Sequence, residues 1–218
     1  MLRLNLTLAA IAWVTGAGSV QSAEIRASVR DAGGAPVADA VVVASPVDGA
    51  VRPKPPASPE EVDQIDHQFA PRVKPVFLGT AVRFPNRDNV RHHVYSFSPA
   101  KQFELPLYAG TPSAPVVFDV PGVVVLGCNI HDWMIGYIYV SESPFFAKTD
   151  ANGTARLADL PAGRFAVRVW HPQLDGTEQA TRRVLDAGTP AVEAAWEIRL
   201  RPDIRIRRAP TSGSQRRY

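Results

Sequence analysis

Apolar and polar residues alternate along most of this chain, and the apolar positions do not recur at the spacing of an amphipathic helix. In a strand, such alternation places apolar side chains on one face and polar side chains on the other. The pattern therefore predicts strands that are separated by turns rich in proline, glycine and asparagine. The predicted strands are 24–31, 39–46, 77–86, 92–98, 102–108, 115–120, 123–128, 135–140, a hairpin within 147–172, and 192–200. The predicted fold class is all-β.

Two neighbouring segments interrupt the alternation. The segment Asp48–Pro59 is rich in proline, which cannot donate a backbone hydrogen bond to a sheet, so it is predicted to be a linker. The segment Glu60–Asp66 follows it and is the one place where a short helical turn is expected.

Residues 1–23 have the layout of a secretory signal peptide. Arg3 precedes an apolar stretch from Leu4 to Val14, and small residues follow as far as Ala23. This order predicts cleavage after Ser22 or Ala23 and a mature protein that is periplasmic or secreted. A membrane anchor is the alternative, but the apolar stretch is short for a span, so no stable membrane insertion is expected.

The positive charge of the chain is concentrated at its end. The formal net charge is +3 at pH 7, but residues 202–218 carry +4, so the rest of the chain carries −1. The arginines of this tail are Arg205, Arg207, Arg208, Arg216 and Arg217. The tail is expected to be disordered, either without a partner or as a weak contact for an acidic partner or an anionic membrane. Dispersed arginines and few aromatics elsewhere indicate no nucleic-acid partner, and a monomer is expected.

The two outer parts of the chain resemble one known family. Residues 33–45 read GGAPVADAVVVAS, residues 149–170 read TDANGTARLADLPAGRFAVRVW, and EIRL closes the pattern at 197–200. These motifs resemble the carboxypeptidase regulatory-like β-sandwich, a small transthyretin-like or Ig-like fold. The resemblance implies one sandwich built from 24–49 and 144–201, with a linker and a second β domain inserted at 50–143. Three successive modules are the alternative, although two strands alone would not be stable.

The central segment holds the residues with the most specific chemistry. Cys128 is the single cysteine of the chain, and Met134 is its one methionine besides the initiator, with His131 midway between them. A lone thiol in an oxidising compartment must be buried, paired with another chain, or bound to a metal. Sulfur ligands combined with imidazole suit copper, and a copper site of this kind needs a second histidine. The candidates are His67, His92, His93 and His171.

The central segment also resembles the cupredoxins, the Greek-key β-sandwich of blue-copper proteins. FAPRVKPVFLGTAVRFPNRDNVRHHV at 69–94 matches the opening of that family, and FDVPGVVVLGCNIHDWMIGYIYV at 118–140 matches its ending. The spacing from cysteine to histidine to methionine is that of amicyanin. The whole arrangement resembles periplasmic plastocyanin-like proteins labelled methylamine utilization proteins.

The cupredoxin resemblance implies one mononuclear copper with His92, Cys128, His131 and Met134 as its ligands. His92 is preferred over His93 because of the register of Asn86, Asp88 and Val94, and neighbouring strand residues point to opposite faces. By the same resemblance His131 is the exit for electrons, and His93 is a residue that ties two loops together.

Some residues near these ligands differ from the family pattern, and the role of others is left open. Small aliphatic residues precede Cys128 where plastocyanin-like proteins often have aromatics, and Asp132 stands where amicyanin has proline. Trp133 could be a docking surface for a redox partner, a lid over the metal or ordinary packing. His67 is interpreted as a surface residue and His171 as a structural one.

The function that the sequence predicts is electron transfer by a periplasmic type 1 copper protein, with a cytochrome or dehydrogenase as its redox partner. The chain is expected not to be an enzyme, because no second cluster of histidines could build another metal centre. A copper carrier or sensor, and a structural β-sandwich that has lost its copper, are the alternatives.

Overall fold

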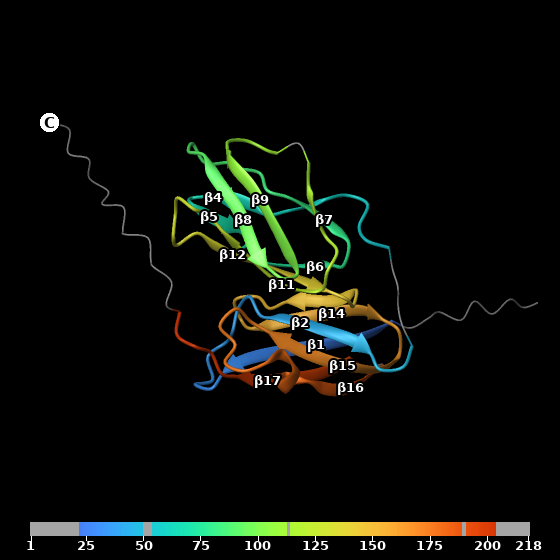
Figure 1. Ribbon diagram of the computed structural model, residues 1–218. Coiled ribbons are helices and arrows are strands. Elements are labelled where there is room, and N and C mark those ends of the chain that lie inside the picture. Colours follow the sequence, from blue (N-terminus) through green and yellow to red (C-terminus); the bar gives the residue numbers. More distant parts are fainter. Residues whose placement is uncertain (1–21, 50–53, 113, 189–190, 204–218) are drawn as a thin grey trace, which may run out of the picture.

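The structure is a computed structural model that describes residues 22–49, 54–112, 114–188 and 191–203. Over these residues the chain forms strands, with a single 3-10 turn η1 at Glu178–Thr181 (Figure 1), which confirms the all-β prediction. No helix among the described residues is long and apolar enough to span a membrane. The predicted signal peptide, apart from its last residues, and nearly all of the basic tail lie outside the described residues.

Strands from both ends of the chain form one unit, which we call the outer sandwich. Its first sheet has the order β14-β1-β17 and its second the order β13-β2-β15-β16. Side chains that alternate along β1, such as Ile25 and Val29, meet Phe165 and Trp196 in a core between the sheets. The strands are β1 Ala23–Asp31, β2 Val41–Pro46, β13 Phe145–Lys148, β14 Thr154–Leu160, β15 Gly163–Trp170, β16 Arg183–Ala187 and β17 Val192–Ile198.

The middle of the chain forms a second unit, the central sandwich. A five-stranded sheet of order β6-β12-β11-β8-β9 faces a three-stranded sheet of order β10-β7-β3, and the hairpin β4-β5 lies beside them. Phe84, Phe118 and Ile138 are buried in the core of this unit. The strands are β3 Glu60–Glu61, β4 Asp63–Ile65, β5 Gln68–Ala70, β6 Val73–Phe77, β7 Thr80–Arg83, β8 His92–Ser98, β9 Lys101–Tyr108, β10 Val116–Phe118, β11 Gly122–Gly127 and β12 Ile135–Ser141.

The two sandwiches are stacked on each other, with the green and yellow strands of the central one above the blue and orange strands of the outer one (Figure 1). Strand β2 is buried on both of its faces, which explains its uninterrupted apolar sequence. One face of β2 packs into the core of the outer sandwich. On the other face, Val41 and Val43 pack with Val73 and Tyr139 of the central sandwich. The Tyr139 hydroxyl also donates to Glu178 Oε1 at 2.6 Å. The interface therefore contains both apolar packing and a hydrogen bond.

The prediction of a helical turn at Glu60–Asp66 is wrong. Residues Glu60–Glu61 pair in parallel with β7, and Asp63–Ile65 pair with β5 to form a hairpin. The turn of that hairpin is Asp66–His67, where both residues have positive φ angles of 54° and 59°. Pairing with distant strands decides the conformation of so short a segment, because its own propensity is weak.

Strand β5 of that hairpin was not predicted, and neither were two further strands. Strand β6 contains Pro75 and pairs in parallel with β12 at the edge of the five-stranded sheet, where a missing N–H is tolerated. Strand β16 is likewise an edge strand, paired with β15. The identity of the outer sandwich as a carboxypeptidase regulatory-like domain, and the boundaries 24–49 and 144–201, stay predictions.

The buried His171 predicts part of the acid sensitivity of the fold. Burial, together with the positive charge of Arg72, lowers the pKa of His171 to about 4. Between about pH 6.5 and pH 4 the unfolded chain therefore binds a proton that the folded chain does not. The free energy of unfolding consequently decreases as the pH is lowered through this range. We expect this residue to account for about 1–3 kcal/mol of that loss.

The measurement is urea unfolding of wild type and His171→Asn at several pH values. Asparagine can still accept the hydrogen bond that the Gln173 N–H donates to His171 Nδ1 at 3.1 Å. The variant should lose stability less steeply between pH 6.5 and pH 4, and equal slopes for the two proteins would contradict the prediction.

Candidate metal centre

The hairpin of β11 and β12 carries the candidate ligands of the central segment. Its last backbone pair is Gly127 with Ile135, so Cys128 and Met134 are the next residues on either strand. Cys128 continues the inward side of β11 after Val124 and Leu126, which explains why its side chain is only 4% exposed. Alternation along a strand thus aims the thiol into the core of the central sandwich.

The residues between Cys128 and Met134 form a tight loop. The Met134 N–H donates to the His131 carbonyl at 2.9 Å, and the Ile135 N–H donates to the Trp133 carbonyl at 3.0 Å. These turns fold the loop back, so His131 returns to Cys128 while Met134 enters the core. Met134 is 1% exposed and belongs to the same buried cluster as Cys128.

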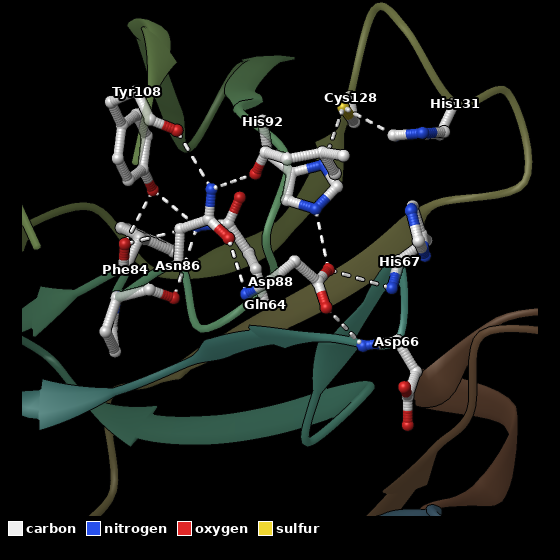
Figure 2. A network of polar contacts seen from close by, with 12 residues as sticks. Gln64, Asp66, His67, Phe84, Asn86, Asp88, His92, Tyr108, Cys128 and His131 are labelled. Carbon is white, nitrogen blue, oxygen red and sulfur yellow. Dashed lines mark hydrogen bonds and ion pairs between the residues drawn. The ribbon is translucent and has the colours of Figure 1, made fainter. Parts of the chain in front are cut away.

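The second histidine near the thiol comes from strand β8, which lies next to β11. His92 is the first residue of β8 and is fully buried. Its Nδ1 lies 3.9 Å from Cys128 Sγ, and His131 Nδ1 lies 3.8 Å from the same sulfur (Figure 2). The three ligand atoms lie within 4.8 Å of one another.

His93 points away from this group. Its Nε2 lies 3.0 Å from Glu104 Oε1 on β9, at ion-pair distance but without hydrogen-bond alignment. Its ring packs against Tyr95, the next outward residue of β8. His92 therefore faces Cys128, and His93 links β8 to β9 on the other side of the sheet.

The distances from the sulfur to the two nitrogens fit a metal ion. With bond lengths of about 2.0 Å to nitrogen and about 2.3 Å to sulfur, trigonal angles of about 120° separate nitrogen from sulfur by about 3.7 Å. The two observed distances from sulfur to nitrogen, 3.8 and 3.9 Å, are close to that value. The donors are two imidazole nitrogens and one buried sulfur, a set that suits a soft or borderline transition metal.

A carboxylate behind His92 sets the orientation of its ring. Asp88 Oδ2 lies 2.7 Å from His92 Nε2, and the backbone N–H groups of Asp66 and His67 donate to the two Asp88 oxygens at 2.8 and 3.0 Å (Figure 2). Burial alone would raise the pKa of Asp88, but these hydrogen bonds hold that pKa below its ordinary value. An ionised carboxylate only accepts, so Nε2 donates to Asp88, and Nδ1 is the nitrogen that faces Cys128.

The loop that holds Asp88 is fixed in turn by buried polar groups. Asn86 donates from Nδ2 to the carbonyls of Val90 and Tyr108, both at 2.9 Å, and accepts the Asp88 N–H at 3.0 Å. Gln64 Nε2 donates to the Tyr108 hydroxyl at 2.5 Å. Burial is the main reason that the pKa of Tyr108 rises to about 12. The network therefore extends from strand β4 to the candidate centre.

One residue that the sequence assigned to the surface lies beside the candidate centre. The ring centroid of His67 is 4.8 Å from that of His131 and 5.6 Å from that of His92. The sequence offered no signal for this position, because His67 reaches the centre through the β4–β5 hairpin, whose first strand lies in the segment that was expected to be helical. Trp133, whose role was left open, packs on His131 with ring centroids 5.2 Å apart.

An aromatic ring packs against the end of β11, just before Cys128, and it comes from the neighbouring strand β8. Tyr95 of β8 lies directly over Gly127, where a Cβ atom would approach its Cζ to 2.7 Å. Tyr95 also packs on His93 and on Phe97, which is 79% exposed. The small residue before Cys128 is therefore needed to admit the Tyr95 ring.

Comparison of the sequence with family models and with curated proteins finds no match. Part of the chain is similar to solved cupredoxin structures. A purple cupredoxin from Nitrosopumilus maritimus is 23% identical, with a TM-score of 0.34, over 38% of this chain and 99% of that chain. A mutant of amicyanin in its oxidized state is 21% identical, with a TM-score of 0.35, over 38% of this chain and 82% of that chain.

A copper-containing nitrite reductase from Thermus scotoductus SA-01 is also similar, with 27% identity and a TM-score of 0.37. The match covers 46% of this chain and 25% of that chain. The expectation that the chain is not an enzyme is withdrawn, because an enzyme stands among the proteins of similar structure. At TM-scores this low the comparisons carry no functional argument, which has to come from the side chains.

The contact between Asp88 and His92 predicts a weaker metal site when the carboxylate is neutralised. Asp88→Asn should lower the affinity for copper about 10- to 100-fold, because the ring of His92 loses its charged acceptor. Competition with a chelator of known affinity measures the change. Asp119→Asn is the matched control, since Asp119 is exposed and pairs with Lys101; equal effects of the two variants would contradict the prediction.

The contact between Gly127 and Tyr95 predicts a packing defect in Gly127→Ala. We expect the free energy of unfolding to fall by about 1–3 kcal/mol, because the added methyl group must displace the Tyr95 ring. Gly188→Ala is the control, since a Cβ there meets nothing within 4 Å. In a Tyr95→Ala background the cost of Gly127→Ala should largely disappear, and an undiminished cost would refute the contact as its cause.

Proposed function

We propose that this chain is a copper protein that transfers electrons, with His92, Cys128, His131 and Met134 as the ligands of one copper. The observation that carries the proposal is the pair of 3.8 and 3.9 Å distances by which two imidazole Nδ1 atoms converge on one buried sulfur. Copper supplies one-electron exchange between its Cu(I) and Cu(II) states. Two histidines, one cysteine and a weak methionine are the donor set of the electron-transfer copper sites.

Each ligand side chain has a distinct task in this proposal. Cys128 would hold the copper through its thiolate, and His92 and His131 would hold it through their imidazole nitrogens. Met134, which lies in the same buried cluster as Cys128, would supply the weaker thioether. The adjacent positions of Cys128 and Met134 at the end of the β11–β12 hairpin support this arrangement, because one backbone pair fixes both.

Electron transfer is fastest where the ligands move little between the two oxidation states, and the surroundings of the candidate centre support rigidity. Asp88 binds His92 and is itself held by backbone N–H groups of the β4–β5 turn. The loop between Cys128 and Met134 is closed by its own backbone hydrogen bonds. Burial of Cys128 and His92 excludes water from the thiolate side.

His131 is the ligand candidate nearest to solvent, since it is half-buried whereas His92 is fully buried. We propose that electrons pass through His131, near which Ile130 is 46% exposed. The partner would be a redox protein such as a cytochrome or a dehydrogenase. The layout of residues 1–23 supports a periplasmic or secreted location.

The decisive experiment is a visible spectrum of the purified protein after addition of one equivalent of Cu(II). An intense blue or purple band from charge transfer between thiolate and copper is expected, because the single cysteine faces two imidazoles. Cys128→Ser should abolish the band. His92→Ala should abolish it as well, whereas His93→Ala should keep it because His93 faces Glu104.

Two outcomes would contradict the proposal. A wild-type protein that binds copper without the band would favour a copper carrier or sensor. A wild-type protein that binds no copper would favour a structural β-sandwich. Loss of the band in His93→Ala with the band kept in His92→Ala would overturn the ligand assignment alone.

A further inference from the structure

His67 packs against the candidate metal centre with a ring that belongs to neither the cysteine loop nor strand β8. Its interplanar angles are 89° with His92 and 79° with His131, so it packs edge to face against both imidazoles (Figure 2). Trp133 packs on His131 as well, at an interplanar angle of 52°. His131, the more exposed of the two histidine candidates, is therefore flanked by two further aromatic rings.

The backbone holds His67 at this place. It is the second residue of the tight turn between β4 and β5, and its φ of 59° is uncommon for a residue other than glycine. Its N–H donates to Asp88 Oδ2 at 3.0 Å, the same oxygen that lies 2.7 Å from His92 Nε2. One carboxylate oxygen thus fixes both the candidate ligand His92 and the ring that covers it.

The contacts of the His67 side chain are those of packing. Its Nδ1 atom is buried and has no hydrogen-bond partner. A buried imidazole nitrogen without a partner lowers the free energy of unfolding. Hydrogen bonding at Nδ1 therefore does not explain why the His67 ring lies at this place. What the ring does at this place is fill space next to two candidate ligands.

We propose that His67 is a positioning residue that closes the metal centre to small exogenous ligands by holding its ring against His131 and His92. It acts through His131, whose ring it keeps in place together with Trp133, and it occupies the space that an added anion or imidazole would need. This inference rests on the proposed copper function. The hairpin β4–β5 is then the part of the central sandwich that controls access to the centre.

The test compares wild type, His67→Ala and His67→Phe, each loaded with Cu(II), during titration with azide and with imidazole. The readouts are the visible band and the electron paramagnetic resonance spectrum, which change when a new donor enters the copper coordination. His67→Ala should bind azide about tenfold or more tightly than wild type, because the ring no longer fills the site. His67→Phe should behave as wild type, since phenylalanine keeps the ring and removes no hydrogen bond made by Nδ1.

The outcomes separate this inference from the proposed function. If wild type shows no thiolate band, the proposed function fails and the inference fails with it. If wild type shows the band but binds azide as tightly as His67→Ala, the inference alone is wrong. If His67→Phe binds azide like His67→Ala, the imidazole nitrogen and not the ring closes the site, and the proposal is overturned.

His171→Ala is the matched control, because it removes a buried imidazole away from the centre and should leave azide binding unchanged. Thermal unfolding of the copper-free proteins shows whether His67→Ala still folds. Should it not fold, the comparison of wild type with His67→Phe and with Trp133→Ala still tests the proposal. Removal of the second flanking ring should then loosen His131 and admit azide, and unchanged azide binding in Trp133→Ala would count against it.

Discussion

The carboxylate of Asp88 is the group on which the candidate centre depends. It binds the ring of His92, and it accepts backbone N–H groups from both residues of the β4–β5 turn. Two segments that are separate in sequence, 66–67 and 88–92, are therefore joined at one side chain. Because these bonds outweigh the effect of burial and lower the pKa of Asp88, the group stays charged and fixes the direction in which His92 can offer its free nitrogen.

A second constraint is the closure of the β11–β12 hairpin. The pair Gly127–Ile135 decides that Cys128 and Met134 leave the sheet side by side. The absence of a side chain at Gly127 admits Tyr95, which continues an aromatic row along β8 from His93 to the exposed Phe97. The same residue that closes the hairpin therefore also leaves room for a row of rings on the outward face of β8.

The outer sandwich packs against the five-stranded sheet that carries the candidate ligands. Strand β2 packs on both faces, and Tyr139 of β12 reaches Glu178 of the outer unit. Strand β12 begins directly after Met134, so the interface restrains a strand that leads into the candidate centre. A unit stacked in this way limits movement of the five-stranded sheet beneath the ligands.

Much of this protein could be predicted from local patterns. The alternation of side chains predicted the β class and most strands, since burial of one strand face requires a period of two. The grouping of Cys128, His131 and Met134 was visible because all three lie in one short loop. The choice of His92 over His93 rested on the register of the cupredoxin motif, and strand alternation added only that one of the pair can face the metal. The structure places His92 toward the sulfur.

What the sequence by itself determined is the set of residues that are near one another along the chain, together with the face of the strand on which each lies. Tertiary structure alone decided the rest. It made strands of Glu60–Asp66 through pairing with β7 and β5, and it carried His67 to the ligands and Tyr95 over Gly127. The physical reason is that these contacts join distant segments, whose meeting depends on sheet order and register, and neither is encoded in a local pattern of apolar and polar residues.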